Sequence, residues 1–172
     1  VAASDVTHDM RRAAKTINFG IIYGMGDSAL AKRLGIEKQK ATEFITKYFE
    51  RYKGVKKYMT DVVEDARTTG SVTTLCGRRR FMPDLTSGNR AVRLAAERIA
   101  QNTPIQGTAA DILKLAMLKF VEPPVAEAKM ISTVHDELVF EIPEKLAEEA
   151  GAKIKQTMEQ VFELDVPLVV EV

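Results

Sequence analysis

Residues 11–24 read RRAAKTINFGIIYG and place two cations and two aromatic rings at a constant spacing. The four side chains are each four residues apart: Arg11, Lys15, Phe19 and Tyr23. In a helix each such step turns the position by only about 40°, so the four are predicted to form a winding strip about 18 Å long. Two cations suit the oxygens of a triphosphate, and two rings beyond them suit a sugar and a base. An amphipathic helix with core rings and solvated cations would show the same spacing.

Helices are predicted throughout the first part of the chain. A Thr-His-Asp start can cap a helix over residues 7–23, and the glycines at its far end allow another backbone or a base to approach closely. A short helix is expected over 27–35. Two amphipathic stripes follow at 37–52 and 55–66, and we expect them to form an antiparallel helical pair.

Strands enter in the second part of the chain. Residues 71–76 are β-prone and are followed by a turn at Gly77. A helix is predicted over 90–102, broken at Pro104 and resumed over 107–121.

A hairpin is predicted near the end of the chain, with strands at 130–134 and 137–142 around a tight turn. A last helix opens at Pro143, and a final strand is expected to begin near Leu164. The fold class is therefore α+β, mostly helical with a small antiparallel sheet covered by helices.

The composition, with 45% hydrophobic and 28% charged residues, is that of a globular protein. No apolar run reaches the roughly 18 residues of a membrane span, and the first ten residues do not form a signal peptide. The single cysteine, Cys76, excludes an internal disulfide and a cysteine-rich zinc site, and indicates a reducing compartment. Because the chain starts at Val1 and ends within a predicted strand, we expect it to be cut at both ends.

Charge is unevenly distributed along the chain. Residues 1–100 hold 19 Lys/Arg against 11 Asp/Glu, a net charge of +8, whereas residues 101–172 hold 6 against 13, a net charge of −7. The basic half favours a polyanionic partner such as nucleic acid, although solvated helices also carry many charges.

Two further groups of residues stand out. The turn of the predicted hairpin holds His135, Asp136 and Glu137. A carboxylate on a rigid hairpin is a good ligand for Mg²⁺, although acidic turns are common. Three residues four positions apart can donate hydrogen bonds to minor-groove acceptors, although they would equally suit a solvated face: Arg98, Asn102 and Gln106.

The sequence resembles the family A DNA polymerases, the DNA polymerase I family, over nearly its whole length. Residues 11–24 resemble motif B of the fingers, and residues 134–138, VHDEL, resemble motif C of the palm. Residues 96–98 and 102–111 resemble palm helices, and residues 74–80, TLCGRRR, also look like a family segment in which Arg78 and Arg79 would make phosphate or structural contacts.

The resemblance implies a role for each residue of the strip. Arg11 and Lys15 would bind the phosphates of the incoming nucleotide, and Lys15 would also protonate the leaving pyrophosphate. Phe19 would pack on the incoming sugar and base. Tyr23, with Gly24, would hold the position of the template base.

The resemblance also implies the chemistry of the hairpin. Asp136 would ligate the catalytic metals, two Mg²⁺ ions for which Mn²⁺ can substitute. His135 would touch the primer end, and Glu137 would have a supporting catalytic role. Three residues would contact the minor groove of the primer–template: Arg98, Asn102 and Gln106.

The implied activity is template-directed DNA synthesis, in which a DNA-directed DNA polymerase adds deoxynucleoside triphosphates to a primer 3′-hydroxyl by two-metal phosphoryl transfer. Residues 1–70 would belong to the fingers and 71–172 to part of the palm. The expected partners are primer–template DNA and deoxynucleoside triphosphates, without a membrane, for a monomer. The expected location is the cytoplasm, at the bacterial nucleoid, with an organellar or phage origin left open.

The family's second metal-binding aspartate, in motif A, has no counterpart in the sequence, and we expect it upstream of Val1. The fragment alone is therefore expected to be inactive. Two alternatives stay open. A non-catalytic nucleic-acid-binding module would explain the basic half but not the turn at Asp136. A metal-dependent nuclease would explain Asp136 but needs more carboxylates.

Overall fold

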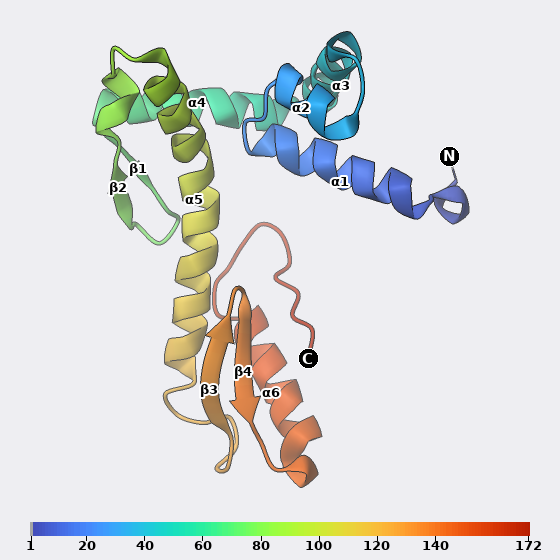
Figure 1. Ribbon diagram of the computed structural model, residues 1–172. Helices are drawn as coiled ribbons and strands as arrows, with labels where there is room; N and C mark the ends of the chain where they lie inside the picture. The colour runs from blue at the N-terminus through green and yellow to red at the C-terminus, as the bar shows by residue number, and fades with distance from the viewer. Residues whose placement is uncertain (1) are drawn as a thin grey trace. The chain divides into compact units, whose positions relative to one another are not determined.

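The computed structural model describes residues 2–172 and divides into two compact units, residues 1–104 and 105–172. Most described residues are helical, and each of the two sheets is a two-stranded antiparallel hairpin (Figure 1), which confirms the α+β class. Within residues 2–172, no helix combines the length and the apolar character needed to cross a membrane.

The first unit begins with a 3₁₀ turn, Ala3–Asp5, and helix α1, His8–Ile22. The helix starts where Oγ1 of Thr7 accepts a hydrogen bond from the backbone N–H of Met10 at 3.2 Å. It ends in a Schellman motif, in which the N–H of Met25 donates to the carbonyl of Gly20 at 2.8 Å. Gly24, which lies between Gly20 and Met25 in the sequence, has a φ of +75°, which glycine adopts without a steric penalty. The predicted helix and its glycine end are therefore confirmed.

Helices α2 (Asp27–Leu34) and α3 (Lys38–Arg51) form a small core that holds α1. Leu30 of α2 and Ala41 of α3 are fully buried, and Ile17 of α1 packs against them. The hydroxyl of Tyr48 on α3 donates to Oδ1 of Asn18 on α1 at 3.1 Å. One face of α1 is thus fixed by apolar packing and a hydrogen bond.

Asp27 links the start of α2 to α3. Its Oδ1 accepts from the backbone N–H of Ser28 at 2.6 Å, and its Oδ2 accepts from the hydroxyl of Thr42 at 3.2 Å. The ammonium of Lys38 lies 3.6 Å from Oδ2. The Ser28 N–H, and then the charge of Lys38 and the Thr42 hydroxyl, lower the pKa of Asp27 below its ordinary value of 3.8.

We expect the Asp27→Asn variant to melt at a lower temperature than the wild type near pH 7, and the difference to shrink toward about pH 3. Because the pKa is lower in the folded state, ionised Asp27 stabilises the fold above its unfolded pKa, and this contribution is lost as the pH falls through the folded pKa. Thermal unfolding at both pH values tests this, with Asp165→Asn, an exposed carboxylate, as the matched control. An Asp27→Asn difference that did not change with pH would contradict it.

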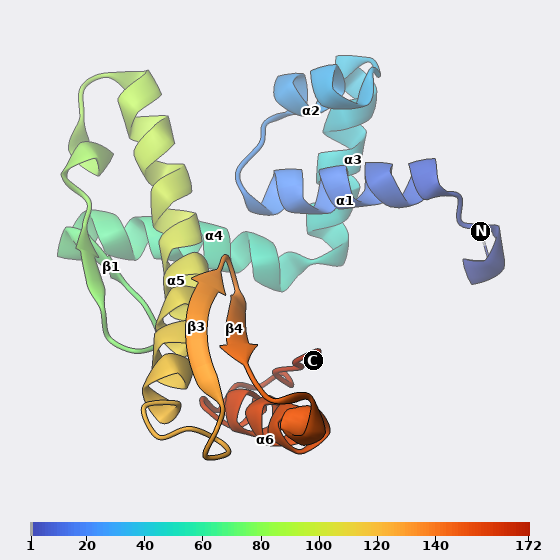
Figure 2. The same ribbon diagram turned by 60° about the horizontal axis from the view of Figure 1, so that its bottom comes forward.

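Helices α3 and α4 (Lys53–Thr69) meet at Tyr52, which is both the C-cap of α3 and the N-cap of α4. Figures 1 and 2 show α4 leading away from α3 at a wide angle. The predicted antiparallel pair is therefore wrong. A helical hairpin needs a loop of about two to five residues to reverse the chain, and one residue only bends it. Helix α3 packs instead against α2.

The second core of this unit lies between α4, the hairpin β1–β2 and the upstream half of α5 (Arg90–Lys119). Strands β1 (Ser71–Thr73) and β2 (Arg79–Phe81) pair in the register Val72↔Arg80, and Gly77 turns between them with a φ of +84°. A short 3₁₀ helix, Pro83–Thr86, leads to α5. The buried side chains come from all of these elements: Val63, Ala66, Val72, Met82, Leu85, Ala96 and Ala100.

Helix α5 runs without interruption through Pro104, so the predicted break there is wrong. A proline inside a helix costs about 3 kcal/mol, because it lacks an N–H and crowds the preceding turn. Apolar burial on both sides offsets this cost: Ala96 and Ala100 are buried upstream, and Ala116 and Phe120 are buried downstream. The two compact units divide immediately after this proline.

The second unit contains the rest of α5, the hairpin β3–β4 and helix α6 (Ala147–Glu159), which follows a 3₁₀ turn at Glu144–Leu146. Strands β3 (Lys129–Val134) and β4 (Glu137–Glu141) pair as predicted, with Val134 opposite Glu137. The core of the unit is formed by buried side chains of α5 and α6, with the ring of Phe140 edge-on to Phe120 at 5.1 Å between centroids.

Residues 160–172 form no strand, so the predicted final strand is wrong for the chain as described. A strand needs a neighbouring strand for its backbone hydrogen bonds. Here the N–H of Val170 donates instead to Oε1 of Glu159 at 3.0 Å. The end of the chain thus returns along α6, where Val172 packs close to Gly151.

The two units also differ in charge. Residues 101–104 carry no charged side chain, so the first unit has the net charge of +8 and the second the net charge of −7. The boundary between the two compact units lies after residue 104. The assignment of 1–70 and 71–172 to functional subdomains remains a prediction.

Candidate functional site

The strip on α1 is exposed to solvent. Ile21, on the opposite face, is buried, whereas the rings of Phe19 and Tyr23 are 51% and 45% exposed. Arg11 and Lys15 are exposed as well. Large aromatic side chains usually lose most of their exposure in a core, so these two rings are not core residues in this unit.

The two cations of the strip are free to bind an anion. Among the residues that the structure describes, neither Arg11 nor Lys15 forms an ion pair. The neighbouring Arg12 differs, because its guanidinium is bound to Oδ1 of Asp9 at 2.8 Å. Among the described residues, α1 therefore carries one cation in an ion pair next to two that have none.

The two rings of the strip stack on each other. Their centroids lie 6.2 Å apart, and their planes are inclined by only 15°. Phe19 and Tyr23 thus present a continuous aromatic surface at the end of the helix that lies away from the cations. Such a surface can meet the face of a base or the apolar side of a sugar.

Gly24, which follows the strip, lies directly against α5. A Cβ at this position would lie 2.7 Å from Cγ and 3.1 Å from Cδ of Arg98. Any larger residue would therefore clash with Arg98, in addition to the strain of a φ of +75°. The structure thus brings together two residues predicted to contact DNA, which are 74 positions apart in the sequence.

The three residues predicted to contact the minor groove, called here the polar row, all belong to α5: Arg98, Asn102 and Gln106. Arg98 and Gln106 are exposed and Asn102 is half-buried. Arg98 and Asn102 belong to the first compact unit and Gln106 to the second.

The hairpin turn exposes its three polar residues: His135, Asp136 and Glu137. His135 has a φ of +55°, which the first loop residue of a tight two-residue hairpin requires and which histidine tolerates better than most residues. The hydroxyl of Thr133 donates to the carbonyl of Glu137 at 3.0 Å across the strands. The turn therefore holds Asp136 at the tip of a braced hairpin.

The carboxylates of the hairpin do not by themselves complete a metal site. Asp136 and Glu137 are adjacent, but the described residues contain no group of three or more His, Cys, Asp or Glu side chains that could hold a metal ion. A pair of Mg²⁺ ions needs several oxygen ligands in near-octahedral geometry. Asp136 can supply only part of such a set.

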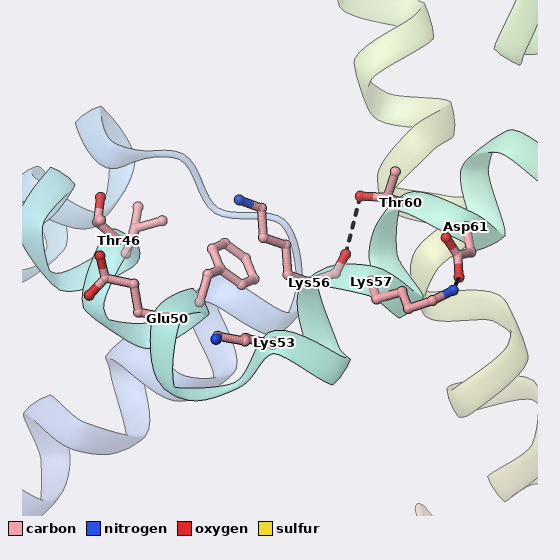
Figure 3. A pocket seen from close by; sticks show the side chains of 9 residues that line it. Thr46, Glu50, Lys53, Lys56, Lys57, Thr60 and Asp61 are labelled. Atoms are coloured by element: carbon pink, nitrogen blue, oxygen red, sulfur yellow. Dashed lines mark hydrogen bonds and ion pairs between the residues drawn. The ribbon is translucent and has the colours of Figure 1, made fainter.

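An open pocket lies in the corner between α3 and α4 (Figure 3). The ring of Phe49 and the aliphatic side chain of Ile45 contribute apolar surface to the pocket. Lys57 forms an ion pair with Asp61 in its lining. Three lysines face two acidic residues among its lining side chains, so it lacks the one-sided charge of an anion site. The complete lining is Ile45, Thr46, Phe49, Glu50, Lys53, Lys56, Lys57, Thr60 and Asp61.

Sequence reasoning missed the residues that connect the site to the scaffold. Gln101 donates from Nε2 to the carbonyl of Met59 at 3.2 Å, and Tyr58 donates to the carbonyl of Gln101 at 3.0 Å. Tyr48 similarly holds Asn18 of α1. No local pattern distinguishes Gln101 from its polar neighbours Asn102 and Thr103, and its partners lie about 40 residues away in the sequence.

Comparison with known proteins places this chain in context. The family model described as DNA polymerase family A matches residues 1–172. The thermostable DNA polymerase I of Thermus filiformis is 52% identical over 164 residues, covering 95% of this chain and 20% of that protein. The DNA polymerase I of Geobacillus stearothermophilus is 47% identical over 174 residues, covering 99% and 20%. The chain thus spans about a fifth of the length of these relatives.

A solved structure is similar over the same extent. The POL domain of Pol1 from M. smegmatis, in complex with DNA primer-template and dNTP, superimposes with a TM-score of 0.90 at 41% sequence identity. The match covers 98% of this chain and 30% of that one. With the matching family model and these identities over nearly all its residues, the chain belongs to DNA polymerase family A.

Proposed function

We propose that this chain takes part in template-directed DNA synthesis, in which deoxynucleoside triphosphates are added to a primer 3′-hydroxyl. The observation that carries the proposal is the exposed strip of α1, with two unpaired cations followed by two stacked rings. Membership of the polymerase family and the similarity to a polymerase bound to primer-template and dNTP support it. The activity belongs to a longer protein, because the chain spans only a fifth of its relatives.

In this proposal the cationic end of the strip binds the triphosphate. The planar guanidinium of Arg11 can bind two phosphate oxygens, and the ammonium of Lys15 adds a compact charge. Lys15 also gives its proton to the pyrophosphate as it leaves, acting as a general acid. Neither cation has to break an ion pair first, which distinguishes both from Arg12.

The aromatic end of the strip takes the rest of the nucleotide and the template. Phe19 packs on the incoming sugar and base, because its ring is exposed next to the cations. Tyr23, at the C-terminal cap of α1, and Gly24 are assigned to hold the template base. Gly24 also lets Arg98 approach closely, so the base position adjoins α5.

The polar row of α5 and the turn of the hairpin contact the primer–template. Acceptors in the minor groove occur on every base pair, so side chains there respond to pairing geometry more than to sequence. His135 is assigned to the primer end. Three side chains are assigned to the minor groove: Arg98, Asn102 and Gln106.

Asp136 is proposed as one carboxylate of the metal site, with Glu137 in support. Divalent ions, Mg²⁺ or Mn²⁺, would neutralise the phosphates and activate the primer hydroxyl. Because the described residues do not complete a set of ligands, the remaining carboxylate is proposed to come from outside these 172 residues. We further propose that 1–70 is fingers and 71–172 part of the palm, in a cytoplasmic, nucleoid-associated monomer.

Templated addition of one nucleotide tests the function. The experiment uses a polymerase of the same length as these relatives that contains residues 1–172. This protein is called here the full-length polymerase. Four templates that differ in one base are each offered one deoxynucleoside triphosphate at a time. We expect the complementary nucleotide to be added in every case. Addition that ignores the template, or shortening of the primer as by a nuclease, would contradict the proposal.

A further inference from the structure

Gln101 lies where three elements of the first unit meet. It is on α5, one turn after Arg98, and it is half-buried. Its Nε2 donates to the carbonyl of Met59 on α4 at 3.2 Å. The hydroxyl of Tyr58, also on α4, donates to the backbone carbonyl of Gln101 at 3.0 Å. Both the side chain and the backbone of Gln101 are therefore bonded to α4.

The other end of the same amide faces the turn after α1. Oε1 of Gln101 lies 3.4 Å from the point that a Cβ of Gly24 would occupy, and Cγ of Arg98 lies 2.7 Å from that point. Gly24 is therefore enclosed by two side chains of α5, and it directly follows Tyr23. A small shift of α5 along α4 would change the space in which this turn lies.

We propose that Gln101 is a positioning residue for reading the template. It holds α5 at one position on α4, so that Arg98 and the Gly24 turn keep a fixed spacing. The inference rests on the proposed function, in which Tyr23 and Arg98 contact the DNA. A misplacement of about 1 Å in a site can cost about 100-fold, so discrimination between a correct pair and a mismatch depends on a rigid spacing of this kind.

The side-chain amide of Gln101 suits this role because it carries both a hydrogen-bond donor and an acceptor. Its N–H reaches the Met59 carbonyl, while its oxygen lies beside the turn. Leucine at the same position would fill the space but would lose the hydrogen bond to α4. Glutamate would keep an oxygen beside Gly24 but would place a second acceptor against the Met59 carbonyl.

A second link between the same helices provides a matched control. Nη2 of Arg67 on α4 is bound to Oε1 of Glu97 on α5. This pair joins α4 to α5 without lying against Gly24. Arg67→Met therefore weakens the attachment of the two helices in general, whereas Gln101→Leu weakens it at the turn.

The test measures kcat/KM of the full-length polymerase for a correct and for a mismatched nucleotide on one template. We expect Gln101→Leu and Gln101→Glu to raise the misinsertion ratio about fivefold, the effect of losing one hydrogen bond, with less than about a twofold change for the correct nucleotide. Arg67→Met is expected to leave the ratio unchanged. Unfolding temperatures of all variants show whether each is folded.

The outcomes are separable. An unchanged ratio in both Gln101 variants, or an equal rise in Arg67→Met, would overturn the positioning role and leave the proposed function intact. If Gln101→Leu does not fold, the isosteric Gln101→Glu decides the result alone. If the unaltered polymerase adds no templated nucleotide, the proposed function itself fails, and the inference fails with it.

Discussion

Replacing Asp136 with alanine is expected to abolish primer extension by the full-length polymerase, lowering kcat by about 10³-fold or more. A carboxylate that binds catalytic metal supplies several kcal/mol of transition-state stabilisation, and about 4 kcal/mol corresponds to a factor of about 10³. The fold should persist, because the side chain is exposed and forms no hydrogen bond or ion pair with residues 2–172. DNA binding is therefore expected to change by less than about threefold, since the phosphate and groove contacts remain.

Steady-state extension of a labelled primer and a DNA-binding titration together measure this effect. The matched control is Asp165→Ala, which removes an exposed carboxylate from the same unit. It is expected to extend the primer as well as the wild type does. Extension by Asp136→Ala at more than a tenth of the wild-type rate would show that Asp136 is not a catalytic ligand.

Lys15→Ala is expected to lower kcat/KM for the incoming nucleotide by about 10²- to 10³-fold. The variant loses an unpaired charge from the triphosphate site and the proposed donor of a proton to pyrophosphate. Arg12→Ala removes a cation three residues earlier on the same helix, but one that is neutralised by Asp9. We expect Arg12→Ala to lower kcat/KM for the incoming nucleotide by less than about threefold.

Single-turnover addition of one nucleotide over a range of concentrations separates the two roles of Lys15. A loss confined to the affinity for the nucleotide would indicate binding of the phosphates alone, and an additional loss in the maximal rate of addition would indicate the proton transfer. The assignment is wrong if Lys15→Ala and Arg12→Ala differ by less than about threefold.

Local signals predicted most of the secondary structure. Thr7 caps α1 and Gly24 ends it, because each acts through hydrogen bonds to its near neighbours in sequence. The hairpin at His135 follows from turn residues between β-prone segments in the same way. The turn at Gly77 was also predicted, but strand β2, which follows it, was not. These features depend on contacts over a few residues, which a sequence pattern records.

The wrong predictions concern either longer-range packing or the length of a connection. Pro104 stays within α5 because burial on both sides outweighs a local penalty. The two helices joined at Tyr52 diverge because the linker has one residue. The tail beyond Glu159 is not a strand, because its backbone bonds to a side chain of α6. In each case the decisive partner is remote, or the outcome depends on the length of a connection.

Some parts of the candidate site could likewise be predicted from local sequence, and others could not. The strip of α1 could be predicted because its four members share one helix face, and the structure adds that both cations are unpaired and both rings stacked. The approach of Gly24 to Arg98 and the bonds of Gln101 join distant segments, so no periodicity indicates them.

The central claim, that the α1 strip holds the incoming nucleotide, is tested most directly by nucleotide binding without chemistry. The full-length polymerase is bound to a primer that lacks a 3′-hydroxyl, and the affinity for each deoxynucleoside triphosphate is measured. We expect the wild type and Arg12→Ala to bind the complementary nucleotide preferentially, and the double variant Arg11→Ala/Lys15→Ala to bind it at least about 100-fold more weakly. Equal affinity in the double variant and the wild type would contradict the account.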